Sequence, residues 1–208
     1  MNLLLISFAL FLSTLPAEAI IGGHSFDLKT ASADEIKMAS HTVVLLNTEN
    51  PSSHSRCSGT LVAPNILLTA AHCIDTNLSN LWVVTSQYEF AVSERHAVVK
   101  MLSHSGYKHF DKPFDNQPNN DLALVQFSGN LPTGYSPTSW VSYFPTVQSR
   151  FSLPVAGYGE THEGQGDSGE LRLGQVTVYE FSTSLSYFKG DQLIAQGICK
   201  GDSGGLLF

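Results

Sequence analysis

The stretch Cys199-Lys200-Gly201-Asp202-Ser203-Gly204-Gly205-Leu206-Leu207-Phe208 decides how the rest of the chain is interpreted. Its serine follows an acid and is surrounded by glycines, which tolerate positive φ and let other backbone approach closely. A tight turn of this kind can present a serine hydroxyl for nucleophilic attack. The pattern alone is weak, because the same residue types build ordinary turns and Gly166-Asp167-Ser168-Gly169 repeats it in this chain.

Two upstream segments carry the other groups that a serine nucleophile needs. Leu68-Thr69-Ala70-Ala71-His72-Cys73 offers a histidine base, and Asn120-Asp121-Leu122-Ala123-Leu124-Val125 offers a carboxylate that can orient it. With Ser203 the chain order is His, Asp, Ser. In these three segments the chain resembles the chymotrypsin/trypsin-like serine proteases, and the resemblance extends from Ile20 to Phe208.

The resemblance implies an all-β fold of two six-stranded antiparallel Greek-key barrels, the second incomplete at its C-terminal end. The residues agree with an all-β chain, because short apolar runs alternate with turn residues and no long helical periodicity occurs. We predict strands at 41–46, 59–63, 66–69, 81–84, 89–92, 96–99, 122–127, 153–159, 175–179 and 193–198.

The expected organisation is a signal peptide followed by two domains. Residues 1–19 are the signal peptide, residues 20–127 the first barrel with His72 and Asp121, and residues 128–208 the second barrel with Ser203. Glycine and proline are frequent at 128–137, which favours a connection between two halves there.

The composition describes a globular chain, and the N-terminal pattern predicts that it leaves the cell. Of the 208 residues, 42% are hydrophobic and 14% are charged, which is enough apolar material for a core. The net charge of −7 removes nucleic acid from the expected partners. An apolar run at 3–15, too short to span a bilayer, precedes Ala17-Glu18-Ala19, a cleavage pattern typical of signal peptides. A buried N-terminal helix is the alternative. We expect an extracellular or periplasmic protein without a membrane anchor.

Removal of residues 1–19 exposes Ile20-Ile21-Gly22-Gly23, the pattern with which mature members of the family begin. The resemblance implies that the new α-amine folds inward and pairs with Asp202, whose buried carboxylate needs a compensating charge. Because the cleavage pattern directly precedes Ile20, we expect signal cleavage itself to generate this amine, without a separate zymogen step.

The three cysteines fit an exported chain with one disulfide and one remaining thiol. Cys57 and Cys73 flank two apolar stretches that can pair as a hairpin leading to His72, and a bridge between them would contribute about 3 kcal/mol. The family partner of Cys199 would lie beyond Phe208. No CxxC or HExxH spacing occurs, so we expect no metal and no cofactor. The remaining histidines are interpreted as surface residues: His24, His41, His54, His96, His104, His109 and His162.

Two of the three roles have competing residues. Asp111 and Asp115 lie near Asp121, but their surroundings are polar, whereas Asp121 directly precedes a buried apolar run. Ser168 shares with Ser203 a glycine two residues before it, but polar residues surround it and no apolar strand follows. A loop serine without rigid support does not hold the geometry that attack requires. We therefore assign Asp121 and Ser203.

The resemblance implies a serine endopeptidase that works through an acyl-enzyme. Ser203 attacks the peptide carbonyl, His72 accepts and returns the proton, and Asp121 orients the imidazole. The backbone amides of Gly201 and Ser203 are expected to bind the oxyanion. Gly197 would form the base of the primary specificity pocket. Because Gly197 carries no charge, we predict cleavage after a neutral or apolar residue.

The expected protein is a monomer whose partners are polypeptide substrates and protein inhibitors. The chain stops within a strand at Phe208, where the family continues, so we expect these 208 residues alone to be unstable and inactive. The alternatives are a non-catalytic homologue that acts as a binding module, an inactive fragment, or a secreted β-protein with coincidental motifs. The joint presence of His72, Asp121 and Ser203 argues against a binding module, which has no physical need for all three.

Overall fold

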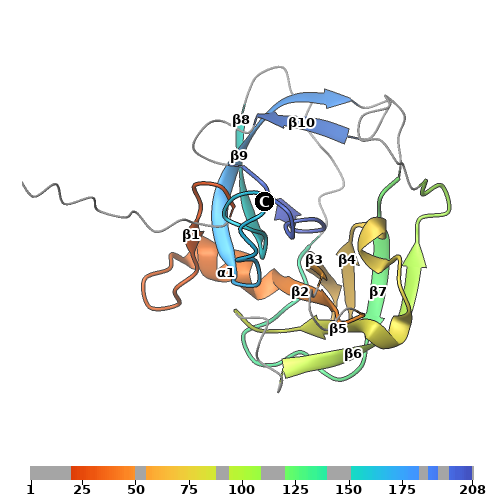
Figure 1. Cartoon of the computed structure of the whole chain (residues 1–208). Coiled ribbons are helices and arrows are strands. Elements are labelled where there is room, and N and C mark those ends of the chain that lie inside the picture. The colour runs from red at the N-terminus through yellow and green to blue at the C-terminus, as the bar shows by residue number, and fades with distance from the viewer. Residues whose placement is uncertain are drawn as a thin grey trace, which may run out of the picture.

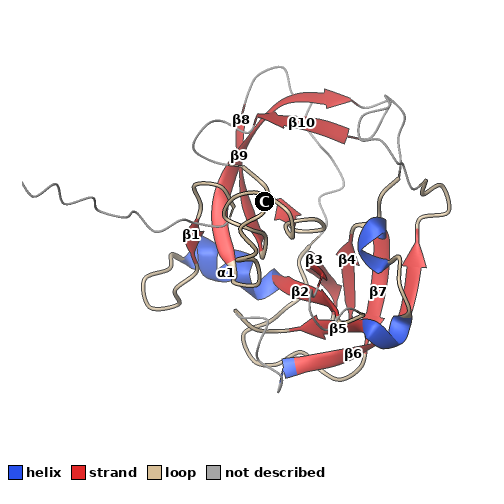
Figure 2. Cartoon of the chain, viewed as in Figure 1, coloured by secondary structure: helices blue, strands red, loops and turns tan. Residues whose placement is uncertain are grey.

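The computed structural model describes residues 20–49, 55–87, 94–108, 120–139, 151–182, 187–191 and 197–207. Strands dominate these residues and form a closed barrel and a second sheet beside it (Figure 1 and Figure 2). The helical elements among them are α1 and two short 3-10 turns, η1 and η2. The predicted signal peptide at 1–19, the predicted strand at 89–92, and the competing acids Asp111 and Asp115 lie outside the described residues.

Six antiparallel strands form the barrel. They are β2 (Thr42–Asn47), β3 (Ser55–Ala63), β4 (Ile66–Thr69), β5 (Leu81–Val84), β6 (Arg95–Ser103) and β7 (Ala123–Phe127). The strands close in the order β2-β3-β4-β7-β6-β5. The strands predicted at 66–69 and 81–84 have the bounds that the structure shows for β4 and β5.

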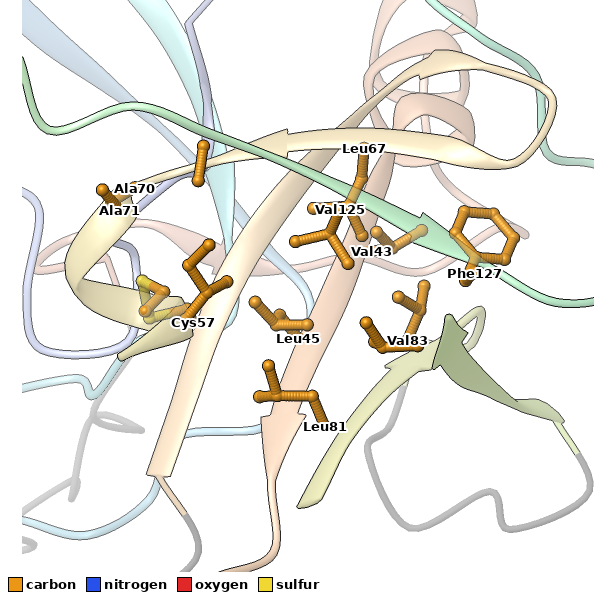
Figure 3. Close-up of a cluster of buried hydrophobic side chains, with 14 of the residues drawn as sticks. Val43, Leu45, Cys57, Leu67, Ala70, Ala71, Leu81, Val83, Val125 and Phe127 are labelled. Carbon is orange, nitrogen blue, oxygen red and sulfur yellow. A yellow bond between two sulfur atoms is a disulfide. The ribbon is translucent and has the colours of Figure 1, made fainter. Parts of the chain in front are cut away.

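Burial alternates along β4 and β7, as it does in a sheet with one face on a core. In β7, Ala123, Val125 and Phe127 are buried, whereas Leu124 between them is exposed. The side chains that converge inside the barrel are apolar (Figure 3); the labelled ones include Val43, Leu45, Leu67, Leu81, Val83, Val125 and Phe127. This packing holds the strand ends, where the candidate site lies.

Strand β2 is buried on both faces. Val43 and Leu45 belong to the barrel core, whereas Val44 and Leu46 pack in a second cluster that contains Tyr158. Successive apolar residues in one strand favour such two-sided burial. Strand β2 is therefore a wall that the barrel shares with the second half of the chain.

The second sheet has five antiparallel strands. They are β1 (His24–Ser25), β8 (Phe151–Gly157), β9 (Arg172–Ser182), β10 (Tyr187–Asp191) and β11 (Leu206–Leu207). The order is β1-β9-β8-β11, with β10 also paired to β9. The predicted all-β fold is thus confirmed, with one closed barrel and a second sheet, while closure of a second barrel stays a prediction.

A helix precedes the barrel where the sequence analysis predicts none. Helix α1 (Ala33–His41) begins with a capping box: the Ser32 hydroxyl accepts from the Glu35 amide, and the Glu35 carboxylate accepts from the Ser32 amide. The helix is nine residues long. None of the helices in the described ranges has the length and the apolar character needed to cross a membrane.

Two histidines interpreted as surface residues are covered to different degrees: His41 is buried and His96 is half-buried. His41, predicted to begin a strand, is the last residue of α1, is buried, and donates from Nδ1 to the Ser136 carbonyl at 2.7 Å. His96 is half-buried and donates from Nδ1 to the Ser128 carbonyl at 3.1 Å. In both cases a carbonyl from a distant loop provides the hydrogen bond that makes burial of a polar ring tolerable.

The capping box leads to a prediction about stability. Replacing Ser32 by Ala removes the side-chain acceptor for an unpaired amide in the first turn, so the free energy of unfolding should fall by about 1 kcal/mol in urea titrations. The matched variant Ser32→Asp keeps an acceptor and should retain most of that stability. Equal losses in both variants would show that the cap does not stabilise α1.

Candidate active site

Local chain geometry fixes the position of His72. Strand β4 ends at Thr69, Ala70 is extended, and η1 (Ala71–Ile74) then carries the histidine. A disulfide joins Cys57 in β3 to Cys73 in η1, as predicted, and lies at the end of the barrel core (Figure 3). The neighbours Ala71, Cys73 and Ile74 are buried while His72 is exposed, so the ring projects outward from a rigid support.

Asp121 binds His72 through two hydrogen bonds. The ring Nδ1 lies 2.7 Å from Oδ2, and the His72 backbone amide donates to Oδ1 at 2.9 Å. Asp121 lies just before β7, and its neighbour Asn120 has a φ of 49° and donates from its side chain to the Gly106 carbonyl. Because the Asp121 carboxylate binds both the backbone amide and the ring of His72, it fixes the rotation of the ring and the tautomer with the proton on Nδ1.

The pair changes the acidity of both partners. The hydrogen bond to Asp121 outweighs partial burial and raises the pKa of His72 above 6.5. Burial of Asp121 opposes its ionisation, but the hydrogen bonds from the His72 ring and amide outweigh this effect and lower its pKa below 3.8. The arrangement therefore stabilises the imidazolium next to an ionised carboxylate, as a general base requires after it has taken a proton.

The turn that carries Ser203 packs tightly against the ends of both β-structures. Gly201 has a φ of 101° and Gly204 a φ of 78°, which disfavour any side chain. A Cβ at Gly201 would lie 2.9 Å from the Gly159 Cα, and one at Gly204 would collide with Thr69 Oγ1. Glycine at 204 thus lets the turn approach the end of β4, which leads to His72, and glycine at 201 lets it approach the segment that follows β8.

The structure brings Ser203 to the same end of the barrel as His72. The Ser58 amide donates to the Ser203 carbonyl at 2.8 Å, and that carbonyl lies 4.0 Å from Sγ of Cys73, the residue after His72. Both residues are described, and no hydrogen bond joins the His72 ring to the Ser203 hydroxyl. The direct contact is therefore between His72 and Asp121, with Ser203 adjacent.

The backbone amides assigned to oxyanion binding have no partner. In the turn, Asp202 donates to the Cys199 carbonyl at 3.0 Å and Gly205 donates to the Asp202 carbonyl at 2.8 Å. Within the described part of the chain, the amides of Gly201 and Ser203 donate to no other group. Two unpaired donors in one turn are what the binding of an oxyanion needs.

Asp202 is a buried acid held by backbone amides. Its carboxylate accepts from Gly159 and from Cys199, each at 2.8 Å. Burial raises the pKa of Asp202 to about 6, although the two hydrogen bonds and the positive charge of Arg172 each lower it. The Arg172 side chain is itself buried and pairs with Glu170 at 2.9 Å, while its Nε and Nη1 have no hydrogen-bond partner.

The segment that begins at Ile20, the predicted mature N-terminus, pairs with Gly197, the residue predicted to form the base of the pocket. Ile20 is fully buried in a cluster with Val155 and Val176. The next residue, Ile21, forms an antiparallel bridge with Gly197, whose amide donates to the Ile21 carbonyl at 2.8 Å. Ile20 follows Ala19 in this chain, so its nitrogen is an amide, and no ion pair joins it to Asp202 in the described residues.

Two other groups draw attention and do not contribute to the candidate site. Ser168 accepts a hydrogen bond from Arg56 at 3.3 Å and has no histidine partner among the described residues. Cys57, His72 and Cys73 lie close enough to suggest a metal site, but the two sulfurs are bonded to each other and are not thiolate ligands. Sequence analysis missed the contributions of Ser58 and Arg172, because neither belongs to a pattern of catalytic residues.

Comparisons with known proteins identify the family of this chain. A family model described as Trypsin matches residues 30–208. The chain belongs to the trypsin family. This trypsin-family chain is 28% identical over 163 residues to serine protease SP24D of Anopheles gambiae, with 72% of the chain and 56% of that protein covered. It is 28% identical over 174 residues to chymotrypsin-C of Bos taurus, with 73% of this chain and 60% of chymotrypsin-C covered. The chain thus spans less than two thirds of the length of these two relatives.

A solved structure of HL collagenase shares the fold of this trypsin-family chain. The TM-score is 0.64 at 20% sequence identity, and the match covers 90% of this chain and 80% of the collagenase chain. At this identity the likeness concerns the fold alone.

The contact between His72 and Asp121 leads to a prediction about protonation. Asp121→Asn removes the negative charge and replaces the carboxylate acceptor by a neutral amide, so the pKa of His72 should fall toward its ordinary value. A pH titration of the His72 ring signals by NMR measures it. Asp75→Asn, which removes an acid just after η1, is the matched control and should leave the titration unchanged. An unchanged pKa in Asp121→Asn would contradict the paired geometry.

Proposed function

We propose that this trypsin-family chain forms the catalytic body of a secreted serine endopeptidase. The observation that carries the proposal is the doubly hydrogen-bonded pair of Asp121 and His72 beside the turn of Ser203. Similarity to two proteins named as a serine protease and a chymotrypsin supports it. The fold that we propose for the whole catalytic body is two Greek-key barrels, with residues 20–127 in the first and residues 128–208 in the second.

The proposed reaction proceeds through an acyl-enzyme. Ser203 Oγ attacks the carbonyl carbon of the scissile peptide bond while His72 Nε2 accepts the hydroxyl proton. The carbonyl oxygen becomes an oxyanion, and Asp121 stabilises the imidazolium. As the C–N bond breaks, His72 gives its proton to the leaving amine. Water then attacks the acyl group with His72 again as the base, which releases the acid and restores the Ser203 hydroxyl.

The oxyanion is bound in this proposal by the amides of Gly201 and Ser203. Both amides lack another acceptor in the part of the chain that the structure describes, which supports the assignment. One such donor contributes about 3 kcal/mol to the stability of the transition state. Gly197 is proposed to line the base of the primary pocket. Its lack of charge supports cleavage after a neutral or apolar residue.

The N-terminus is proposed to regulate the site through Asp202. Cleavage after Ala19 would turn the Ile20 nitrogen into an amine, and the fully buried Ile20 side chain provides a place for it in the core. Asp202 is a buried carboxylate whose hydrogen-bond donors are backbone amides. A cation beside it would offset the cost of burying its charge and would order the turn.

The first test of the function is covalent labelling of the full-length protein. A fluorophosphonate probe should attach to Ser203 Oγ with loss of fluoride, and the wild-type protein should cleave peptides. Ser203→Ala should abolish labelling and lower kcat by roughly a million-fold. Ser168→Ala is the matched control, because it removes the other serine of the same motif, and it should keep wild-type labelling. A wild-type protein that neither reacts with the probe nor cleaves peptides refutes the proposed function.

The second test measures how stability depends on pH with and without a free amine at Ile20. When the amine is blocked by acetylation, the raised pKa of Asp202 means that the contribution of Asp202 to stability is fully present below pH 3.8 and is lost as the pH rises through about 6. The loss should amount to roughly 3 kcal/mol. In the protein that begins with a free Ile20 amine, pairing lowers this pKa and the loss should disappear.

Urea unfolding between pH 3 and pH 8 makes the comparison between these two forms. Asp202→Asn is the control, because it removes the titrating carboxyl and should abolish the loss of stability near pH 6 in the blocked protein. If the free and the blocked proteins have the same pH profile while Asp202 is intact, the proposed ion pair does not form.

A further inference from the structure

The Ser58 side chain lies where the barrel, the second sheet and the nucleophile turn meet. Ser58 follows Cys57 in β3 and is completely buried. Its hydroxyl donates to the Gly201 carbonyl at 2.9 Å and accepts from the Tyr158 amide, just after β8, at 2.9 Å. One hydroxyl thus joins three segments that are far apart in the sequence.

The backbone of Ser58 is also fully used. Its amide donates to the Ser203 carbonyl at 2.8 Å, and its carbonyl accepts from the Thr69 hydroxyl at 2.9 Å. Every polar group of Ser58 therefore has a partner. A completely satisfied buried hydrogen-bond network restricts the groups that it joins to one arrangement.

The two carbonyl groups that Ser58 holds belong to the two residues whose amides are proposed to bind the oxyanion. Gly201 needs such support most, because it has no Cβ and its φ of 101° is not limited by a side chain. The Gly201 carbonyl belongs to the peptide plane that follows Gly201, whereas the Gly201 amide belongs to the plane that precedes it, whose Lys200 carbonyl accepts from the Glu160 amide at 2.8 Å. With the plane on each side of Gly201 held by a hydrogen bond, its two backbone dihedral angles have little freedom, and the direction of its amide depends on both contacts.

We propose that Ser58 is a positioning residue, whose hydroxyl aligns the Gly201 amide for oxyanion binding through its hydrogen bond to the Gly201 carbonyl. This inference rests on the proposed peptidase function. Ser58 acts through the Gly201 amide and does not itself contact the substrate. Its loss should therefore destabilise the transition state, in which the oxyanion forms, and leave substrate binding nearly unchanged. Removing the hydroxyl leaves the Gly201 carbonyl and the Tyr158 amide without a partner in a buried place, and the turn must shift to regain partners.

The test uses Ser58→Ala in the full-length protein with a peptide substrate. We expect kcat to fall about 10- to 100-fold with KM changed less than about threefold, because a small displacement of an oxyanion donor affects the transition state alone. Ser58→Gly loses the same hydroxyl, keeps the backbone donor and should show the same decrease. This second variant keeps the test valid if Ser58→Ala does not fold.

A transition-state analogue identifies the step. A peptide trifluoromethyl ketone adds Ser203 Oγ to its carbonyl carbon, the hydroxyl proton passes to His72, and the resulting oxyanion needs the same two amides. Its affinity should weaken in Ser58→Ala by the same factor as kcat. The pKa of His72, followed by NMR, should not change, because the contact with Asp121 does not involve Ser58.

The matched control is Thr42→Val. Thr42 also has a buried hydroxyl that donates to a carbonyl, that of Met38 at 2.8 Å, but this bond belongs to α1 and not to the turn. Thr42→Val should lose stability while kcat and the affinity for the ketone remain at the wild-type level. If the Ser58 variants behave like Thr42→Val, Ser58 is only structural and the inference is wrong.

The outcomes separate this inference from the proposed function. A wild-type protein that reacts with the fluorophosphonate and cleaves peptides, while the Ser58 variants keep their kcat, overturns the role of Ser58 alone. A wild-type protein without reaction at Ser203 overturns both. A joint loss of kcat and of affinity for the ketone, with KM and the His72 pKa preserved, supports the inference.

Discussion

The hydrogen bond from the Ser58 amide to the Ser203 carbonyl is the contact on which the site depends, because it attaches the C-terminal turn to the barrel. The turn has to come close for this bond to form, and the space is limited by Thr69 on one side and Gly159 on the other. Glycines at 201 and 204 follow from this crowding as much as from their positive φ. The motif is thus a consequence of how tightly one backbone packs on another.

Hydrophobic packing keeps the two sides of the site in register. Strand β2 places Val43 and Leu45 in the barrel core and Val44 and Leu46 in the cluster with Tyr158, so the two β-structures share one wall. A shared, close-packed wall does not slide without exposing apolar surface. Because η1 extends from the barrel and the Ser203 turn packs against the barrel, this shared wall sets the distance between His72 and Ser203.

The sequence predicts the parts of the structure that depend on local patterns. Strands β4 and β5 are short apolar runs between turn residues, and their bounds agree with prediction. The contact between Asp121 and His72 follows a recognisable motif. Helix α1 has a signal in Ser32 and Glu35, but the helix is only nine residues long and about half of them are polar, so periodicity does not reveal it. The burial of His41 and the hydrogen bonds of Ser58 depend on partners from distant segments, which no local pattern indicates.

The electrostatics of the second sheet shows why the turn is sensitive to charge. Gly157 is opposite Arg172 in the pairing of β8 with β9, and a Cβ at Gly157 would meet the Asp202 carboxylate, so arginine and acid occupy the same face. The positive charge of Arg172 lowers the pKa of Asp202, but burial still raises it to about 6, and two nitrogens of the guanidinium remain without partners. Incompletely compensated charges in a buried place cost free energy. Here the buried charge belongs to Asp202, the residue next to Ser203, so a cation that pairs with Asp202 would also stabilise the conformation of the Ser203 turn.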